Sequence, residues 1–236
     1  MTQTSSIIPA VIIAIGIAVG GGLLAKGVER FRMDDRVITV KGLAELDVES
    51  DFATWNLVFR RAANSFGEVQ RALANDRDLV VQFLKNAGLE PDEYEIQPLQ
   101  IEDTFSRDFG PQNQPVRFTG TGRIVVNSKR IDLVTSTALA VDPLIKQGIA
   151  LMGGNGPWYQ LRAFNEAKAP LLAAATRNAR QQAVQFAAEA GADLGRLRSA
   201  NQGVISITAA NSQFGDDMSA RTKRLRVVST FQYELE

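Results

Sequence analysis

The sequence contains no cysteine and no histidine among its 236 residues. Without cysteine there can be no disulfide, no thiolate nucleophile and no cysteine-ligated metal. Without histidine the chain lacks the commonest general base near neutral pH and the commonest metal ligand. These absences exclude Ser-His-Asp and Cys-His catalysis. We therefore expect no catalytic residues, no metal and no cofactor.

A net charge is also missing, because 26 Lys and Arg side chains balance 26 Asp and Glu side chains. The chain has no global field that would attract nucleic acid or an anionic surface. Its densest basic stretch runs from Arg221 to Arg226 and has no interleaved aromatic residue, whereas a nucleic-acid site would contain such residues. We interpret this stretch as charge that protects an edge strand. No nucleic-acid partner and no small-molecule ligand are expected.

The longest apolar run covers residues 7–25, from Ile7 to Ala25, and contains no charged or polar side chain. As a helix it would measure roughly 28 Å, close to the hydrocarbon thickness of a bilayer. A soluble helix of this length normally shows a polar face. We predict a single transmembrane anchor at 7–25, after a tail at 1–6 and before a juxtamembrane linker at 26–35. The lipid bilayer is then its partner.

A cleaved signal peptide is the alternative interpretation of the same run. Against it, no Lys or Arg precedes the run, and no small residue stands three positions before a cut after Ala25. An uncleaved anchor is therefore favoured. Lys26, Arg30 and Arg32 follow the run, so the positive-inside rule taken alone would place the rest of the chain in the cytoplasm.

Small residues form two rows along the predicted anchor. They are Ala14, Gly16, Ala18, Gly20 and Gly22. Gly16 and Gly20 make a G-x-x-x-G pair, a spacing that lets helices approach closely in lipid. Gly and Ala are also frequent in membrane helices that do not self-associate. Packing of this helix against another helix is thus one of two interpretations.

Residues 36–236 are predicted to form one α+β domain, with an antiparallel or mixed sheet and helices on one face. The element order is ββαββ followed by αβαββ. The predicted strands cover 37–49, 52–62, 94–105, 116–127, 158–164, 196–210 and 221–235, and the predicted helices cover 65–88, 129–151 and 165–190.

Local signals fix several boundaries of these elements. Ser65 with Glu68 three residues later predicts a capping box, and Gly88 predicts a helix C-terminus. The second helix is expected to break near Pro143. A glycine inside a strand indicates a bulge or bend, which we expect at Gly42 and at the pair Gly120 and Gly122.

Acidic residues form three clusters, which are the remaining candidates for chemistry. They are Asp47, Glu49 and Asp51, then Glu102, Asp103 and Asp108, and last Asp216 and Asp217. Asp47 and Glu49 share a strand face, as a carboxylate pair in a hydrolase would. No loop has the spacing of an EF-hand calcium site. Solvated strand edges and turns explain the clusters more simply.

Three stretches of the chain resemble the SIMPL-domain family of bacterial periplasmic proteins, which are named for oxidative-stress defence and immunogenicity. The stretches are Val37 to Glu45 with Ala53 to Leu57, Asn86 to Leu89 with Tyr94 to Gln97, and Ala167 to Gly195. The resemblance covers about residues 36–236. It implies an α+β fold, and it implies large ring-like assemblies because some members form them. It implies no catalytic residue.

The family's bacterial members are exported, so the resemblance also implies a domain in the periplasm, tethered to the bacterial inner membrane. We let this outweigh the charge signal. The resulting hypothesis is a non-enzymatic envelope protein that self-assembles, as a ring or otherwise, or binds a protein partner in envelope or oxidative stress. One alternative is an accessory single-pass subunit of a larger membrane protein complex. Another is a carboxylate- or metal-dependent hydrolase.

Overall fold

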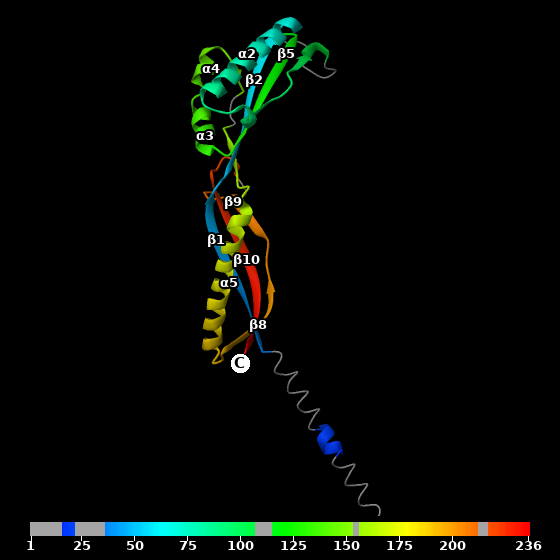
Figure 1. Ribbon diagram of the computed structural model, residues 1–236. Helices are drawn as coiled ribbons and strands as arrows, with labels where there is room; N and C mark the ends of the chain where they lie inside the picture. The colour runs from blue at the N-terminus through cyan, green and yellow to red at the C-terminus, as the bar shows by residue number, and fades with distance from the viewer. Residues whose placement is uncertain (1–15, 22–35, 107–114, 153–155, 212–216) are drawn as a thin grey trace, which may run out of the picture. The chain divides into compact units, whose positions relative to one another are not determined.

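The computed structural model describes residues 16–21, 36–106, 115–152, 156–211 and 217–236 (Figure 1). Of the predicted anchor at 7–25, residues 16–21 are helical, and its other positions lie outside the described residues. The predicted tail and linker also lie outside them. Among the helices in these ranges, none has both the length and the apolar character needed to cross a membrane.

The chain divides into two compact units. The first comprises Met1–Glu45, Ala169–Ile205 and Arg226–Glu236, and the second comprises Leu46–Lys168 and Ser206–Leu225. Two sheets are present, one of four strands and one of six. Strand pairs in both sheets are antiparallel. The α+β class is therefore confirmed, and two antiparallel sheets replace the single sheet that was expected.

The second unit contains the six-stranded sheet. Its strands are β2 (Phe52–Ala63), β3 (Tyr94–Ile96), β4 (Gln100–Asp103), β5 (Phe118–Ser128), β6 (Ala150–Leu151) and β7 (Trp158–Gln160). Its helices are α2 (Phe66–Asn86), α3 (Ile131–Leu139) and α4 (Asp142–Lys146), with 3-10 turns η1 (Pro91–Glu93) and η2 (Thr104–Ser106). β2 and β5 pair along their whole length, β3 and β4 pair with the other edge of β5, and β6 and β7 pair with the other edge of β2.

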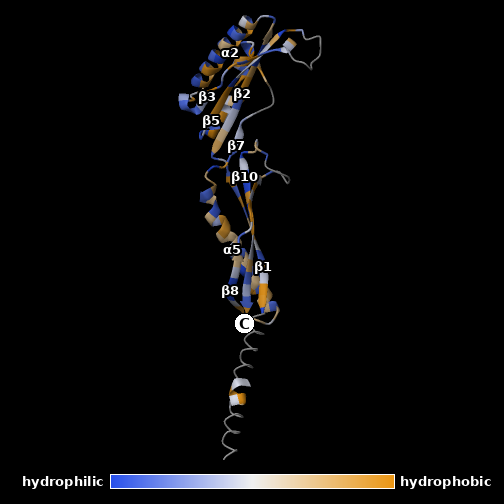
Figure 2. Ribbon diagram, turned by 90° about the vertical axis from the view of Figure 1, so that its right-hand side faces the viewer, coloured by the Kyte–Doolittle hydropathy of each residue, from blue (hydrophilic) through white to orange (hydrophobic). Residues whose placement is uncertain are grey.

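Helices α2 and α3 pack on one face of this sheet, against β2 and β5 (Figure 1). Alternate residues of β2 therefore face a core that includes the fully buried Phe59, Leu73, Ile124 and Val134. Hydrophobic and hydrophilic residues mix along α2, as expected of a helix with one buried face (Figure 2). Among the described residues of the second unit, no helix packs on the other face of the sheet.

The four-stranded sheet has the order β1-β10-β8, and β9 also pairs with β10. Its strands are β1 (Val37–Glu49), β8 (Leu194–Asn201), β9 (Ile205–Ala209) and β10 (Thr222–Leu235), and the long helix is α5 (Phe164–Glu189). Fully buried alanines of α5, Ala179 and Ala183, pack with Val40, Phe231 and Tyr233. Small side chains on this helix face permit a close approach to the strands.

The bulge expected at Gly42 is absent. Cross-strand contacts keep one register on both sides of it, since Leu235 N–H donates to Arg36 O and Arg226 pairs with Glu45. A Cβ atom on Gly42 would lie only 2.0 Å from the Ala175 carbonyl oxygen. Gly42 is therefore required by the close approach of α5.

The bulge expected at Gly120 and Gly122 is absent as well, because the β2–β5 register is unbroken over these residues. A Cβ on Gly120 would lie 2.5 Å from Leu73 Cδ1, and one on Gly122 would lie 2.2 Å from Phe59 Cε2. Both glycines make room for large core side chains beneath the sheet. Glycine is favoured at both positions because a side chain would collide with the core.

Two predicted strands are interrupted. Residues 94–105 form β3 and β4, and Pro98 between them has no N–H for pairing. Residues 196–210 form β8 and β9, with Gly203 between them, where a Cβ would lie 2.0 Å from Val228 O. At α2, Ser65 is the N-cap but its side chain makes no capping bond, so the predicted capping box does not form. Gly88 ends the helix at φ +91°, as predicted.

Candidate functional site

The small residues of the predicted anchor are only partly described. Gly16, Ala18 and Gly20 lie in the helical residues 16–21, whereas Ala14 and Gly22 lie outside the described residues. Among the described residues, no atom lies within 4 Å of a Cβ built on Gly16 or Gly20. The packing role of the row stays a prediction.

The first acidic cluster is divided among separate partners. Arg224 binds both carboxylate oxygens of Asp47 at 2.7 and 2.8 Å, and these hydrogen bonds lower the pKa of that carboxyl group. Glu49 accepts a hydrogen bond from Thr222. Asp51 accepts hydrogen bonds from the backbone N–H groups that precede α5. Each of the three carboxylates is thus bound to a different segment and stabilises the fold there.

The other acidic clusters do not converge either. Asp103 pairs with Arg117, which lowers the pKa of the carboxyl group, and Asp217 bonds to Ser219. Asp108 and Asp216 lie outside the described residues. Within the described ranges, no three acidic side chains come together as a metal site would require.

The basic stretch near residue 224 does not protect an edge, which corrects the prediction. β10 is an interior strand, because β1 pairs with one side of it and β8 and β9 with the other. Arg224 pairs with Asp47, and Lys223 is buried with its Nζ donating to Asp217 O at 2.9 Å. Opposite charges across neighbouring strands stabilise their pairing.

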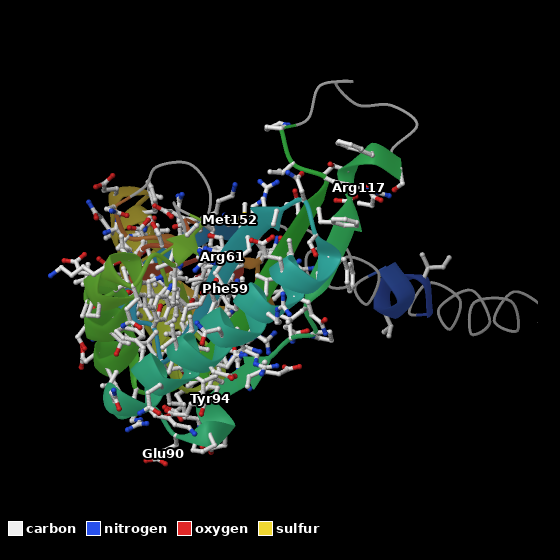
Figure 3. All side chains as sticks on the ribbon, turned by 90° about the horizontal axis from the view of Figure 1, so that it is seen from above. Phe59, Arg61, Glu90, Tyr94, Arg117 and Met152 are labelled. Carbon is white, nitrogen blue, oxygen red and sulfur yellow. The ribbon has the colours of Figure 1, made fainter. Side chains whose placement is uncertain are left out.

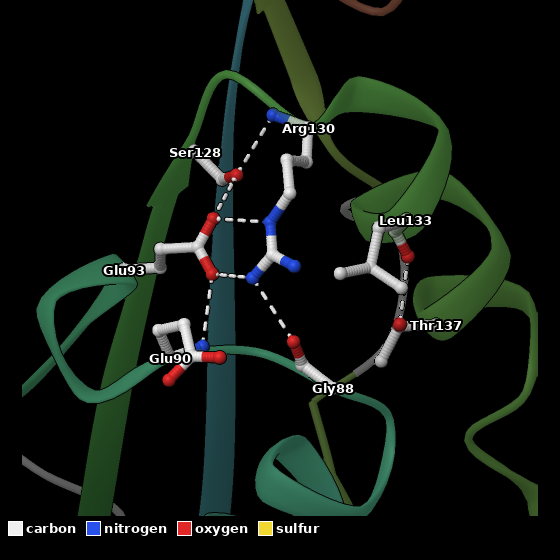
Figure 4. Close-up of polar contacts among 7 residues, drawn as sticks. All are labelled: Gly88, Glu90, Glu93, Ser128, Arg130, Leu133 and Thr137. Atoms are coloured by element: carbon white, nitrogen blue, oxygen red, sulfur yellow. Dashed lines mark hydrogen bonds and ion pairs between the residues drawn. The ribbon is translucent and has the colours of Figure 1, made fainter.

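Glu93 is the centre of a polar network in the second unit (Figure 4). Arg130 binds both oxygens of its carboxylate, Ser128 donates to it at 2.5 Å, and Glu90 N–H donates at 2.9 Å. Arg130 also donates to Gly88 O. The hydrogen bonds from Arg130, with those from Ser128 and Glu90, lower the pKa of Glu93 to about 2. All of its oxygens are engaged, so the network joins η1, β5 and α3.

A second ion pair lies between the sheet and α2. Arg61 of β2 binds Asp76 in a bidentate manner at 2.5 and 2.7 Å, and only 1% of the Asp76 side chain is exposed. The hydrogen bonds that Arg61 donates to Asp76 raise the pKa of Arg61. A carboxylate this deeply buried needs such a partner. The ion pair fixes α2 to β2, and the buried Asp76 carboxylate is not accessible to a substrate.

An apolar groove of about 380 Å³ is the feature best suited to binding. Its walls come from β2, α3, α4 and β6, and the described residues that line it carry no charge. Ile145 and Met152 line it while more than half exposed, at 54% and 52%. Figure 3 labels Met152 near the buried Phe59. Exposed apolar side chains around a hollow are typical of protein-interaction sites.

The sequence did not predict the apolar groove, because the residues that line it are distant from one another along the chain. Trp55 comes from β2 and Ile145 from α4, and only the fold brings them together. The available signal was the apolar Ile145 on a short helix opened by Pro143. Its exposure cannot be inferred from periodicity over five residues.

The comparisons with known proteins give one result. The SIMPL family model, described as a protein of unknown function (DUF541), matches residues 38–230, from β1 into β10. No curated protein matches the chain.

Proposed function

Because the chain belongs to the SIMPL family, whose function is unknown, we propose a function from its surface and its predicted anchor. The protein is a non-enzymatic envelope protein, anchored in the bacterial inner membrane, that self-assembles or binds a protein partner. The apolar groove with its exposed rim at Ile145 and Met152 carries this proposal. The uncharged lining favours binding of apolar side chains over acid–base chemistry.

The test is native mass spectrometry of the full chain in detergent. Ile145→Lys places a charge in the groove, so we expect it to abolish the oligomer or the bound partner. Val184→Lys is the matched control, because Val184 is also half exposed, at 50%, but lies on α5. A wild-type protein that is strictly monomeric and co-purifies with no protein contradicts the proposal.

An accessory subunit of a larger membrane complex is the second candidate. The feature that favours it is the row of small residues Gly16, Ala18 and Gly20, which are helical in the structure. Small residues let a partner helix approach in lipid. Gly16→Leu should remove the partner from a mild-detergent pull-down, whereas Ile17→Leu should retain it. Recovery of a homo-oligomer alone would count against this candidate.

A further inference from the structure

The helix-free face of the six-stranded sheet carries a row of polar side chains. Phe59 and Arg61 of β2 face the helices, so Arg60 between them faces the opposite side and is exposed. The register places Arg60 opposite Thr121 of β5, and Thr121 opposite Gln100 of β4. Guanidinium, hydroxyl and amide groups therefore follow one another across three strands.

These side chains line a groove of about 370 Å³. Arg60, Gln100 and Thr121 share it with Thr119, Glu102 and Met152. The groove is distinct from the apolar one, although Met152 borders both. Three kinds of N–H and O–H donor thus converge on one hollow.

The arginines of this face differ from most others in the second unit. Arg61, Arg117, Arg130, Arg221 and Arg224 each bind a carboxylate. Within the described residues, Arg60 and Arg123 have no carboxylate within 4 Å. Arg123 is opposite Val58, which makes it the diagonal neighbour of Arg60 on the same face.

Two positive charges at this spacing repel each other. Diagonal neighbours across an antiparallel pair have Cα atoms about 7–8 Å apart, within reach of long side chains. Planar guanidinium groups match the oxygens of carboxylates and phosphates. An anion between the two arginines would convert their repulsion into two charge-assisted contacts.

We propose that Arg60 and Arg123, with Thr121 and Gln100, form a binding site for an oxyanion on the helix-free face of the six-stranded sheet. The ligand carries one phosphate or carboxylate group. This inference is independent of the proposed protein-binding role.

The test is a titration of the full chain in neutral detergent with inorganic phosphate, at low ionic strength, followed by NMR of the Gln100 and Thr121 amides. Acetate is titrated in parallel to separate a phosphate site from a carboxylate site. Arg60→Gln should reduce phosphate affinity at least tenfold. Arg71→Gln is the control, since Arg71 is exposed on α2 and has no ion pair within the described residues.

A response to either anion that Arg60→Gln removes and Arg71→Gln preserves supports the proposal. A wild-type response that persists in Arg60→Gln, or no response to either anion, overturns it. Equal losses in Arg60→Gln and Arg71→Gln would show general charge screening and would overturn it too. Amide spectra of each variant outside the groove show whether the fold is intact.

Discussion

At the scale of single residues, the Glu93 network makes stability depend on acid pH. The carboxyl group has a pKa of about 2 in the fold and an ordinary value of 4.5. A lowered folded-state pKa stabilises the fold above pH 4.5, and that contribution is lost as the pH falls from 4.5 towards 2. Glu93→Gln should lower the free energy of unfolding at pH 7 by about 1 kcal/mol.

Urea unfolding at pH 7 and at pH 3 measures this effect. The difference between wild type and Glu93→Gln should shrink at the lower pH, because at pH 3 the carboxyl group binds a proton in the unfolded chain while it stays largely ionised in the fold. Glu95→Gln is the control, since its carboxylate is exposed and, within the described residues, accepts a hydrogen bond from Gln97 alone. An equal stability difference between wild type and Glu93→Gln at both pH values would contradict the lowered pKa of Glu93.

Asp76 offers a second prediction at the residue scale. Replacing it with Asn leaves the Arg61 guanidinium without its carboxylate at a site where Asp76 is almost fully buried. Breaking a buried pair costs about 3–5 kcal/mol, and the partial exposure of Arg61 reduces this to about 2–3 kcal/mol. Denaturant unfolding should show this loss. Asp78→Asn, exposed on the same helix, should change stability by no more than about 0.5 kcal/mol.

At the scale of elements, the packing of α5 on β1 depends on one missing side chain. A Cβ at Gly42 would lie 2.0 Å from Ala175 O and 2.8 Å from Ala179 Cβ. Gly42→Ala should therefore destabilise the protein by about 1–3 kcal/mol, as overpacking does. Gly67→Ala should instead stabilise it by about 0.5–1 kcal/mol, because Gly67 is in α2 with open space around it.

Thermal unfolding should show a lower Tm for Gly42→Ala and a higher Tm for Gly67→Ala. Backbone propensity alone would favour alanine over glycine both in the strand at Gly42 and in the helix at Gly67, so only the close helix explains a loss at Gly42. Equal and small shifts for the two variants would show that α5 can move away from β1 at little cost.

Local patterns predicted most elements well. Strands β1 and β2 and helices α2 and α5 begin and end within two residues of the expected positions. Their signals, such as the alternation in β1 and Gly88 after α2, are contained within each segment. The bulges predicted at Gly42 and Gly122 were wrong, because a bulge and a close packing contact both favour glycine over a residue with a side chain. Only the packing partner, Ala175 or Phe59, distinguishes them.

Pairing between segments that are far apart in the sequence was harder to predict. Nothing local to β10 shows that β1 and β8 flank it, so its arginines were interpreted as edge protection. Asp47 is the partner of Arg224, 177 residues away, and Glu49 is the partner of Thr222, 173 residues away. The apolar groove and the polar face of the six-stranded sheet also depend on register between strands, which one sequence does not fix.

At the scale of the whole molecule, the proposed localisation depends on the membrane anchor predicted at 7–25. The two core clusters lie within residues 38–233, so a chain that lacks residues 1–35 retains them. We expect the full chain to resist carbonate extraction from membranes and the 36–236 chain to be released. Release of the full chain would contradict an anchor at 7–25. Circular dichroism of the shortened chain checks that it is folded.

The side of the membrane that the domain occupies can be tested with a single thiol, because the chain has no cysteine of its own. Ala173→Cys places the thiol at an exposed position on α5. If the domain lies in the periplasm, a maleimide that cannot cross the inner membrane should label it in cells with a permeabilised outer membrane. Labelling only after lysis of the inner membrane would place the domain in the cytoplasm, as Lys26, Arg30 and Arg32 taken alone predict. Ala183→Cys, which is buried, is the control, because it should react only after unfolding.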